Sequence, residues 1–419
     1  MSFAANIDTA SRPLRVLQVN KFHFLNGGAE LYYLGLSDLL RAHGHTVGHF
    51  SMTHPENLPS AQAGYFIDQI NYDNPGGIGG KLKIAAHTVY SREARKKIAR
   101  LLDAEQYDIV HLHNFHHQIT PSILPEIKKR GIPVVFMVQD FKIVCPNYKM
   151  LTHDGVCERC KGGRFYNCTV HRCNKGSLMG SAVNTVEMYF HRMMGYDALY
   201  DVFCAPSRFT AEKIIEFGIP RAKVRHIPNF IDLTQYEPSF TPGNYLLYLG
   251  RLSQEKGVHT LIEAMKRLPD VPMTLTGRGP YEDEIKKQVS ESGLTNLTLT
   301  GHLSGDALRE AIRGCMAVVI PSEWYENCPL ALIEAYAYGK PVIGAKIGGL
   351  GDMVIEGETG CQFEAGNVDA LADTLKRTVG DTARLEAMGR KAREVAEAQY
   401  GAESQYRMIM EIYRGLVRN

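Results

Sequence analysis

The sequence has no long apolar run and almost no net charge. Because no stretch of about eighteen consecutive apolar residues occurs, we expect no transmembrane helix. Residues Met1–Pro13 lack the basic start and apolar core of a signal peptide, which predicts a cytoplasmic protein. The 47 Lys and Arg nearly balance the 45 Asp and Glu, and a formal net charge of +2 argues against a dedicated nucleic-acid-binding protein.

Cysteine is sparse except in one insertion, residues 145–175. Without a secretory leader, cysteines are expected to be reduced thiols or metal ligands. Cys157 and Cys160 are two residues apart, and with Cys168 and Cys173 they can complete a tetrahedral site for structural zinc, or hold an iron–sulfur cluster. Unliganded thiols are the alternative interpretation.

Length and composition are those of a multidomain globular protein. The 419 residues predict roughly two to three domains, and 44% apolar with 22% charged residues is ordinary for such proteins. Residues 229–243 contain prolines and no periodicity, which favours a linker. We therefore expect an N-terminal domain over 1–236 and a second domain over 237–399.

The first domain opens with a strand over 15–20, a loop containing Gly27 and Gly28, and a helix over 31–40. Strand, glycine turn and helix are typical of a doubly wound α/β domain, whose ligands bind at the strand ends. The two glycines would either let the backbone approach a ligand or simply form the turn.

Two further apolar runs, 107–112 and 133–138, predict parallel strands whose ends place His113, Asn114, Gln139 and Asp140 at one edge of the sheet. Asp140 would act as a base or bind an acceptor hydroxyl. Alternatively, its carboxylate caps the following turn.

The second domain repeats the pattern of strand, glycine loop and helix that opens the first. A strand over 245–250 leads into a loop with Gly250, Arg251 and Lys256, and the two cations suit a diphosphate, since Arg offers a planar fork and Lys a point charge. Strands over 271–277 and 297–301 each end in a glycine loop at the same edge, at Gly277 with Gly279 and at Gly301.

The stretch Ser322–Glu334 follows a buried strand and opens a helix. Glu334 is expected inside the helix and Glu326 in the loop before it. The amides of Asn327 to Leu330 are expected to be unpaired and to suit a phosphate. The alternative is a capped surface helix with solvated acids.

Two segments offer a surface to a membrane. Residues 81–100, expected to form a helix, carry seven basic residues and one acid, which suits an anionic membrane surface, the attraction of phosphorylated substrates or a solvated basic face. The predicted helix over 178–200 has a broad apolar face. Such a face is usually core, but its breadth also suits membrane contact.

Together, Gly250–Gly257, Gly277–Pro280, Gly301 and the pair Glu326 and Glu334 resemble the retaining glycosyltransferases of family 4, the glycosyl transferases group 1. The resemblance extends from about Arg15 to the C-terminus. It implies the α/β GT-B fold, with two Rossmann-like doubly wound parallel-sheet domains facing across a cleft, and a final helix, 400–419, packing back onto the first domain.

The resemblance also implies roles for individual residues. Arg251 and Lys256 would hold the donor diphosphate, Glu334 the ribose, and Glu326 the transferred sugar. The backbone near Leu303 would meet the nucleobase, and Gly27 and Gly28 would approach the phosphates. The implied donor-binding set is completed by Gly250, Gly277, Gly279, Asn327, Cys328 and Leu330. No metal is required for catalysis, because cations and helix amides supply positive potential.

One departure concerns Asp140. Many members carry His–Asp where this chain has Gln139–Asp140, which implies that Asp140 orients the acceptor or sugar and is not the base. The expected activity is transfer of a hexose-type sugar from a UDP- or GDP-sugar to a glycan or lipid-linked acceptor in cell-surface polysaccharide or lipopolysaccharide synthesis, at the inner face of the cytoplasmic membrane. The alternatives are a non-catalytic sugar-nucleotide-binding or scaffold protein and a GT-B-fold epimerase.

Overall fold

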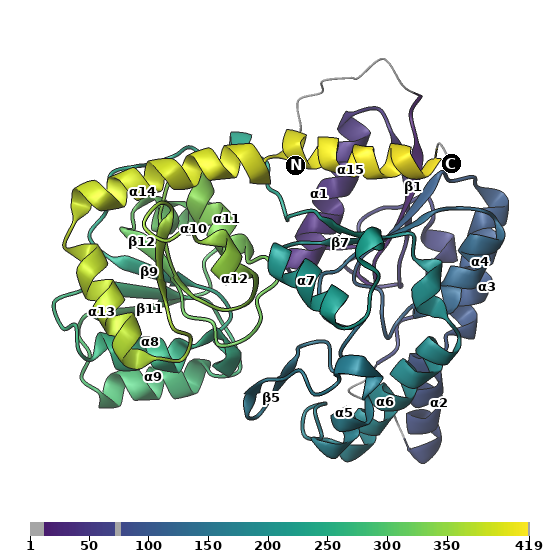
Figure 1. Ribbon diagram of the computed structural model, residues 1–419, viewed down its shortest axis with the longest axis horizontal. Coiled ribbons are helices and arrows are strands. Elements are labelled where there is room, and N and C mark those ends of the chain that lie inside the picture. Colours follow the sequence, from purple (N-terminus) through teal and green to yellow (C-terminus); the bar gives the residue numbers. More distant parts are fainter. Residues whose placement is uncertain (1–11, 72–76, 418–419) are drawn as a thin grey trace. The chain divides into compact units, whose positions relative to one another are not determined.

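The computed structural model describes residues 12–71 and 77–417 (Figure 1). The expectation that the chain has no signal peptide was made from Met1–Pro13. Of these residues, only Arg12 and Pro13 lie within the described part of the chain. The chain forms two compact units, residues 1–227 with 406–419 and residues 228–405. The boundary between residues 227 and 228 lies before the predicted linker, 229–243. Ile231 forms a parallel bridge with Gly401, and the side-chain amide of Asn229 donates to the Cys328 carbonyl at 2.9 Å. Both contacts lie within the second unit, so the start of the predicted linker belongs to that unit.

The first unit contains a six-stranded parallel sheet in the order β2-β1-β3-β4-β7-β8. Its strands are β1 (Arg15–Val19), β2 (Thr46–Phe50), β3 (Ile109–Leu112), β4 (Val134–Met137), β7 (Val202–Ala205) and β8 (Val224–His226), and a small hairpin is formed by β5 (Leu151–Thr152) and β6 (Gly155–Val156). Its helices are α1 (Gly28–Ala42), α2 (Ile78–Val89), α3 (Arg92–Ala104), α4 (Leu124–Lys129), α5 (Tyr166–Val170), α6 (Leu178–Met193) and α7 (Arg208–Glu216).

The second unit repeats the architecture with the order β11-β10-β9-β12-β13-β14, again all parallel. Its strands are β9 (Leu246–Leu249), β10 (Met273–Thr276), β11 (Leu297–Gly301), β12 (Ala317–Ile320), β13 (Val342–Ala345) and β14 (Gly360–Phe363). Its helices are α8 (Val258–Met265), α9 (Glu282–Glu291), α10 (Gly305–Arg313), α11 (Leu330–Ala337), α12 (Gly348–Met353), α13 (Val368–Val379) and α14 (Thr382–Val395).

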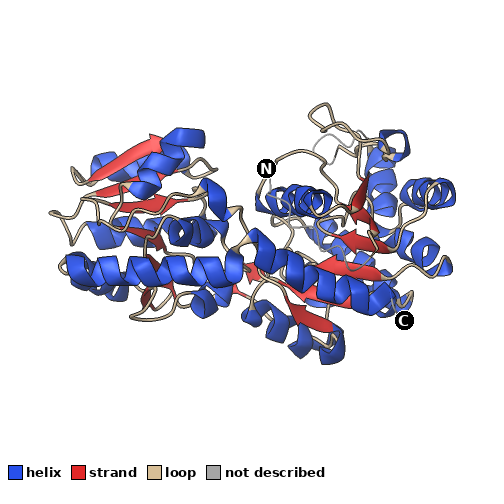
Figure 2. Ribbon diagram, turned by 90° about the horizontal axis from the view of Figure 1, so that it is seen from above, coloured by secondary structure: helices blue, strands red, loops and turns tan. Residues whose placement is uncertain are grey.

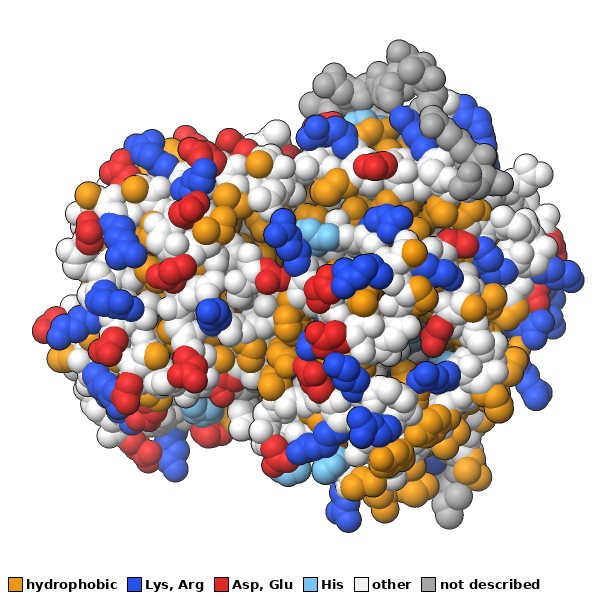
Figure 3. Space-filling model, viewed as in Figure 1, with side chains coloured by type: hydrophobic (Ala, Val, Ile, Leu, Met, Phe, Trp, Pro, Cys, Tyr) orange, Lys and Arg blue, Asp and Glu red, His pale blue; other side chains and the backbone are white. Residues whose placement is uncertain are grey.

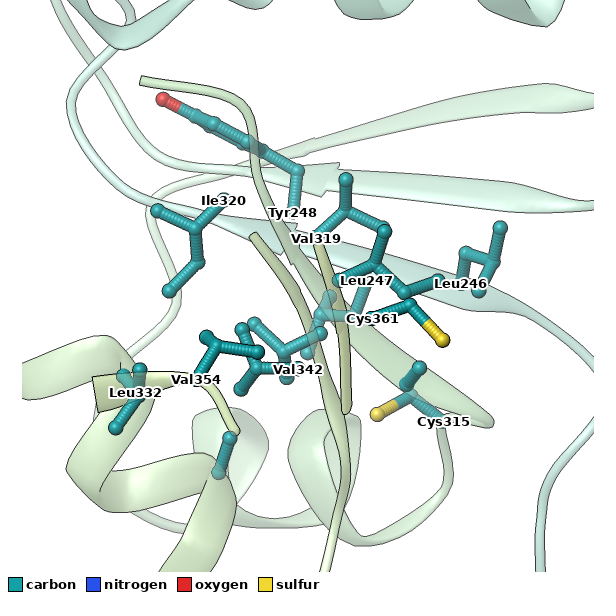
Figure 4. Close-up of a cluster of buried hydrophobic side chains, with 14 of the residues drawn as sticks. Leu246, Leu247, Tyr248, Cys315, Val319, Ile320, Leu332, Val342, Val354 and Cys361 are labelled. Atoms are coloured by element: carbon teal, nitrogen blue, oxygen red, sulfur yellow. The ribbon is translucent and has the colours of Figure 1, made fainter. Parts of the chain in front are cut away.

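The central strands are apolar on both faces because helices cover both sides of each sheet (Figure 2). Every residue of β12 and β13 is buried. Figure 4 shows the resulting core of the second unit, in which Leu246, Val319 and Val342 from three strands pack together. The prediction of two doubly wound α/β domains is confirmed.

Residues 81–100, expected as one helix, form parts of two. The break falls at Tyr90 and Ser91, where the Ser91 hydroxyl accepts a hydrogen bond from the Ala94 amide at 3.1 Å and caps α3. On α3, Arg95 pairs with Glu126 at 2.8 Å and Lys97 with Glu93 at 2.8 Å. Two of the five basic residues of α3 are therefore engaged with the protein's own acids.

The C-terminal helix α15 (Ala402–Val417) begins in the second unit, and its residues from Tyr406 onward belong to the first. The Tyr406 hydroxyl lies 2.9 Å from His45 Nε2, and the Tyr413 hydroxyl lies 2.6 Å from His111 Nδ1. Two buried histidines therefore hold this helix on the first unit. Across the described ranges, no helix has the length and apolarity needed to cross a membrane.

Candidate active site

An ion pair between Lys256 and Glu326 lies at the carboxyl edge of the second sheet. Lys256 ends a short 3-10 turn after β9, and Glu326 follows β12, the strand beside β9 in the sheet. Lys256 Nζ donates to Glu326 Oε1 at 2.6 Å, and the Ser322 hydroxyl donates to the same oxygen at 2.6 Å. The ammonium also lies 5.2 Å from the centroid of the Trp324 ring. The sequence placed both residues in the site but did not predict that they pair.

The electrostatics keep Glu326 ionised. Burial alone would raise the pKa of its carboxyl, but the Lys256 charge and the hydrogen bonds from Lys256 and Ser322 lower it, and the net pKa lies below the ordinary value. A carboxylate with a lowered pKa is a poor proton acceptor at neutral pH. Glu326 is therefore suited to the role of a permanent anion, which orients Lys256 and accepts hydrogen bonds from hydroxyl groups.

A glycine turn supports the backbone of Glu326. The Gly349 amide donates to the Glu326 carbonyl at 2.6 Å. Gly348 has a φ of +57°, and a Cβ there would lie 2.7 Å from the Glu326 nitrogen. Only glycine meets both conditions.

Arg251 is exposed on the loop that follows β9. The Tyr248 hydroxyl donates to the Arg251 carbonyl at 2.8 Å, and Figure 4 shows Tyr248 extending out of the apolar cluster. The same loop packs against the end of β10, since the Leu252 amide donates to the Arg278 carbonyl at 3.0 Å. The glycines at 277 and 279 are explained by this packing, because a Cβ at Gly277 would collide with the Gly250 carbonyl oxygen and one at Gly279 with the Leu252 carbonyl.

Helix α11 begins later than the sequence indicated. It starts at Leu330 with Pro329 as N-cap, so Asn327 and Cys328 lie in the preceding loop and contribute no first-turn amide. Cys328 is buried, and its carbonyl accepts the hydrogen bond from Asn229. The amides at the start of the helix are instead those of Leu330 and Ala331. The shift arises because proline has no amide hydrogen and Pro329 adopts an extended conformation, with ψ of 121°.

Glu334 lies in α11, as predicted, and is half-buried. Burial raises the pKa of its carboxyl to about 7, although a hydrogen bond with Tyr236 acts in the opposite direction. Leu303, also half-buried, follows Gly301 at the end of β11, where Gly301 has a φ of +72°.

The corresponding edge of the first unit carries polar residues that the sequence only partly identified. Asp140 Oδ1 accepts a hydrogen bond from the Lys142 amide at 2.8 Å, which is the turn-capping alternative. Burial raises the pKa of Asp140, while the nearby Lys21 charge opposes the rise; burial also lowers the pKa of Lys21. Lys21 follows β1 in the same way that Asp140 follows β4. This position after a strand is the sequence signal by which Lys21 could have been identified.

Other residues at this edge differ in exposure. Gly27 and Gly28 are exposed, with Gly27 as the N-cap of α1 and Gly28 its first residue. His113 directly follows β3, as predicted, but its side chain is completely buried, stacks on His111 and hydrogen-bonds to Gln18. It therefore offers no exposed group to a ligand at this edge. Asn114 lies at the edge, where its amide donates to Asn20 Oδ1 at 2.9 Å.

The cysteines of the insertion converge on one cavity of about 10 Å³, lined by Cys145, Cys157, Cys160, Cys168 and Cys173. A hydrogen bond between the Cys168 and Cys173 thiols lowers the pKa of Cys168 and raises that of Cys173. All nine cysteines are free. In the part of the chain that the structure describes, no three or more His, Cys, Asp or Glu side chains are arranged to hold a metal ion. The metal site stays a prediction.

Comparison with known proteins connects these features to a family. Residues 27–229 match a glycosyl transferase 4-like domain, and residues 232–395 match glycosyl transferases group 1. The glycogen synthase of Mycobacterium tuberculosis is 32% identical over 261 residues, which cover 58% of this chain and 62% of that enzyme. The chain thus spans less than two thirds of that relative's length.

Two solved structures share the fold over nearly the whole chain. Anabaena HepE in complex with UDP and glucose is 18% identical with a TM-score of 0.67, covering 96% of this chain and 100% of HepE. Sucrose-phosphate synthase from Thermosynechococcus elongatus is 20% identical with a TM-score of 0.69, covering 96% and 99%. From its two matched domains and their fold, the chain belongs to the GT-B glycosyl transferases group 1, with a glycosyl transferase 4-like domain in its first half.

Proposed function

We propose that the protein is a retaining glycosyltransferase that moves a hexose-type sugar from a UDP- or GDP-linked donor to a glycan or lipid-linked acceptor of cell-surface polysaccharide or lipopolysaccharide synthesis. The observation that carries the proposal is the Lys256–Glu326 pair of 2.6 Å at the strand ends, with the exposed Arg251 on the same loop as Lys256. The HepE structure with UDP and glucose supports a nucleotide-sugar donor for this fold.

Each residue has a distinct task in this proposal. Lys256 and Arg251 hold the donor diphosphate and balance the charge that develops on it as the bond to the sugar breaks. The amides of Leu330 and Ala331 add positive potential at the start of α11. Glu326 accepts hydroxyl hydrogen bonds from the sugar, and Glu334 accepts those of the ribose. Asp140, with a raised pKa, orients the acceptor.

The test is a panel of UDP- and GDP-sugars incubated with cell-envelope extract, with nucleotide release and glycosylated product measured together. Lys256→Ala should lower turnover at least about tenfold, because a charged hydrogen bond is lost in the transition state. Lys266→Ala is the matched control, since Lys266 is a partly exposed lysine that pairs with Glu263 at 2.7 Å, away from the Glu326 pair. Unchanged turnover in Lys256→Ala contradicts the site.

The panel also separates the alternatives. Saturable nucleotide-sugar binding without turnover on any acceptor would assign a sugar-nucleotide-binding or scaffold role. Conversion of the donor to its stereoisomer without an acceptor would assign an epimerase.

A further inference from the structure

Helix α6 is oriented with its polar side inward. Five of its buried residues are polar or charged: Ser181, Asn184, Thr185, Glu187 and His191. Its exposed residues include five large apolar side chains: Leu178, Met179, Val186, Tyr189 and Met193, with Met179 and Met193 about three quarters exposed at 74% and 75%. A helix on a water-facing surface normally shows the opposite arrangement.

Internal polar partners hold this orientation. Glu187 is completely buried and accepts a hydrogen bond from Lys142 Nζ at 2.7 Å. His191 Nε2 lies 2.8 Å from the Val89 carbonyl, and the Ser181 hydroxyl accepts from the Asn174 amide at 2.9 Å. Rotating α6 to hide its apolar side would leave a buried ion pair broken. The apolar side therefore faces outward in the folded protein.

Neighbouring helices extend the apolar surface. Both α2 and α5 pack against α6. Tyr166 and Val170 on α5 and Leu82 on α2 are at least half exposed. Figure 3 shows hydrophobic side chains gathered at the lower edge of the molecule, where Figure 1 places α5 and α6. We call the exposed apolar residues of α2, α5 and α6 the apolar face.

The segments that form the apolar face are rich in basic residues. The segments that form it, 78–89 and 161–196, contain a single acid, Glu187, which is buried against Lys142. The exposed cations of these segments include Lys81, Lys83, Arg164, Arg172 and Lys175, whereas Arg192 lies near the exposed acid Asp197, which directly follows the second segment. Surface acids are thus missing from these described segments, while basic residues lie on all three helices or beside them.

We propose that the apolar face docks the protein on an anionic lipid membrane, with the apolar side chains entering the interface and the cations meeting lipid phosphates. Methionine, leucine and valine suit the acyl boundary, and Tyr166 and Tyr189 suit the headgroup level. A second copy of the chain fits less well, because a twofold interface would set these cations against themselves. The proposal rests on this surface alone and does not depend on sugar transfer.

The test is co-sedimentation of the full chain with vesicles, without any nucleotide sugar. Vesicles of phosphatidylcholine with about a third phosphatidylglycerol should bind the protein at least about tenfold better than phosphatidylcholine alone, since each cation near an anionic surface adds about fivefold. Binding should weaken as salt increases. Equal binding to both vesicle types, or to neither, overturns the proposal.

Two variants locate the contact. Met179→Ser/Met193→Ser removes the two most exposed of the large apolar side chains described on α6, and Lys81→Glu/Lys175→Glu reverses two cations beside the face. Each should lower binding to the anionic vesicles at least about tenfold, with an unchanged thermal midpoint and unchanged nucleotide release on a water-soluble acceptor. Controls of the same type elsewhere are Leu58→Ser and Lys287→Glu, both exposed.

The controls should bind as the unmodified protein does. Unchanged binding in both face variants contradicts the location. A dimer in light scattering that Met179→Ser/Met193→Ser converts to monomer would assign the face to a second copy of the chain and overturn the membrane proposal.

Discussion

Lys256 and Glu326, seventy positions apart in the sequence, form an ion pair of 2.6 Å in the second unit. The carboxylate is buried and the ammonium about one quarter exposed, at 24%. The buried carboxylate therefore holds the partly exposed Lys256 ammonium in place at the carboxyl edge of the sheet. Because the two side chains act as a unit, their substitutions should not be additive.

This expectation can be measured with a double-mutant cycle. Glu326→Gln removes the charge that orients Lys256, and it should lower kcat/KM about tenfold to a hundredfold, as for a charge-assisted hydrogen bond. Lys256→Ala should have a similar effect, and the double variant should be little worse than the more severe single one. Losses that multiply would show that the residues act independently.

Gly348 should be intolerant of a side chain for a reason beyond its backbone angle. Gly348→Ala would place a Cβ 2.7 Å from the Glu326 nitrogen, whereas Gly357 has a similar φ of +76° but its Cβ would lie 4.0 Å from the nearest atom, on Arg384. We expect Gly357→Ala to cost about 1 kcal/mol of unfolding free energy. Gly348→Ala should cost about 1–3 kcal/mol more and weaken nucleotide binding. Urea unfolding and calorimetry measure both, and equal costs would contradict the contact.

Nucleotide binding should depend on pH through Glu334. Its pKa of about 7 means that the carboxyl is mostly protonated below pH 7 and ionised above it. Only the ionised form accepts hydroxyl hydrogen bonds on both oxygens. Affinity for UDP or GDP should therefore fall below pH 7, by at most about tenfold per unit.

The nucleotide's own phosphate also titrates near this range, so the comparison with Glu334→Gln carries the test. Titration calorimetry at pH 6 and pH 8 should give a larger affinity ratio for the unmodified protein than for this variant. Identical affinity ratios in the two proteins would show that Glu334 does not contribute to nucleotide binding.

The first unit should lose stability in mild acid. His45 Nδ1 accepts a hydrogen bond from the Leu14 amide at 2.9 Å, so the proton lies on Nε2, which faces the Tyr406 hydroxyl. Burial, with the charge of Arg414, lowers the His45 pKa to about 4. The unfolded chain takes up this proton near pH 6.5. Stability is therefore full above about pH 6.5 and declines toward pH 4, by at most about 1.4 kcal/mol per unit.

Urea unfolding at pH 7 and pH 5 measures this decline. His45→Gln should reduce it, whereas His153→Gln should not, since His153 is 75% exposed. A decline that is the same in all three proteins would assign it to other groups, such as His111, whose pKa burial lowers to about 3.

The cysteine insertion provides a metal test. Its local apolar cluster comprises Cys160, Phe165 and Met188, a small core for such a segment, and Cys157, Cys160, Cys168 and Cys173 line one cavity. If the four thiolates hold a metal, we expect protein purified from a reducing buffer to contain about one equivalent of zinc per chain, or about two to four of iron in a cluster. Cys157→Ser/Cys160→Ser should lose it. Less than a tenth of an equivalent in the unmodified protein contradicts the metal site.

Much of the fold could be predicted from local pattern. Apolar runs such as Ala317–Ile320 followed by glycine or acidic loops predict buried parallel strands with functional ends, because a strand covered on both faces has no polar side. The position of Glu334 in a helix and of Glu326 before it follows from the same local signals. The start of α11 was misplaced by a few residues because a proline can begin a helix or precede one.

Side-chain direction and long-range pairing required the tertiary structure. The apolar residues of α6 predict a core face by periodicity, yet most of the large ones face outward, because Glu187 is held inside by Lys142, which lies in the turn after β4. His113 is buried, although it ends a strand whose neighbours reach the edge. The sequence by itself determined two α/β units and the elements that carry the candidate site. Packing and buried charge pairs, which join residues far apart in the chain, decided which side chains meet.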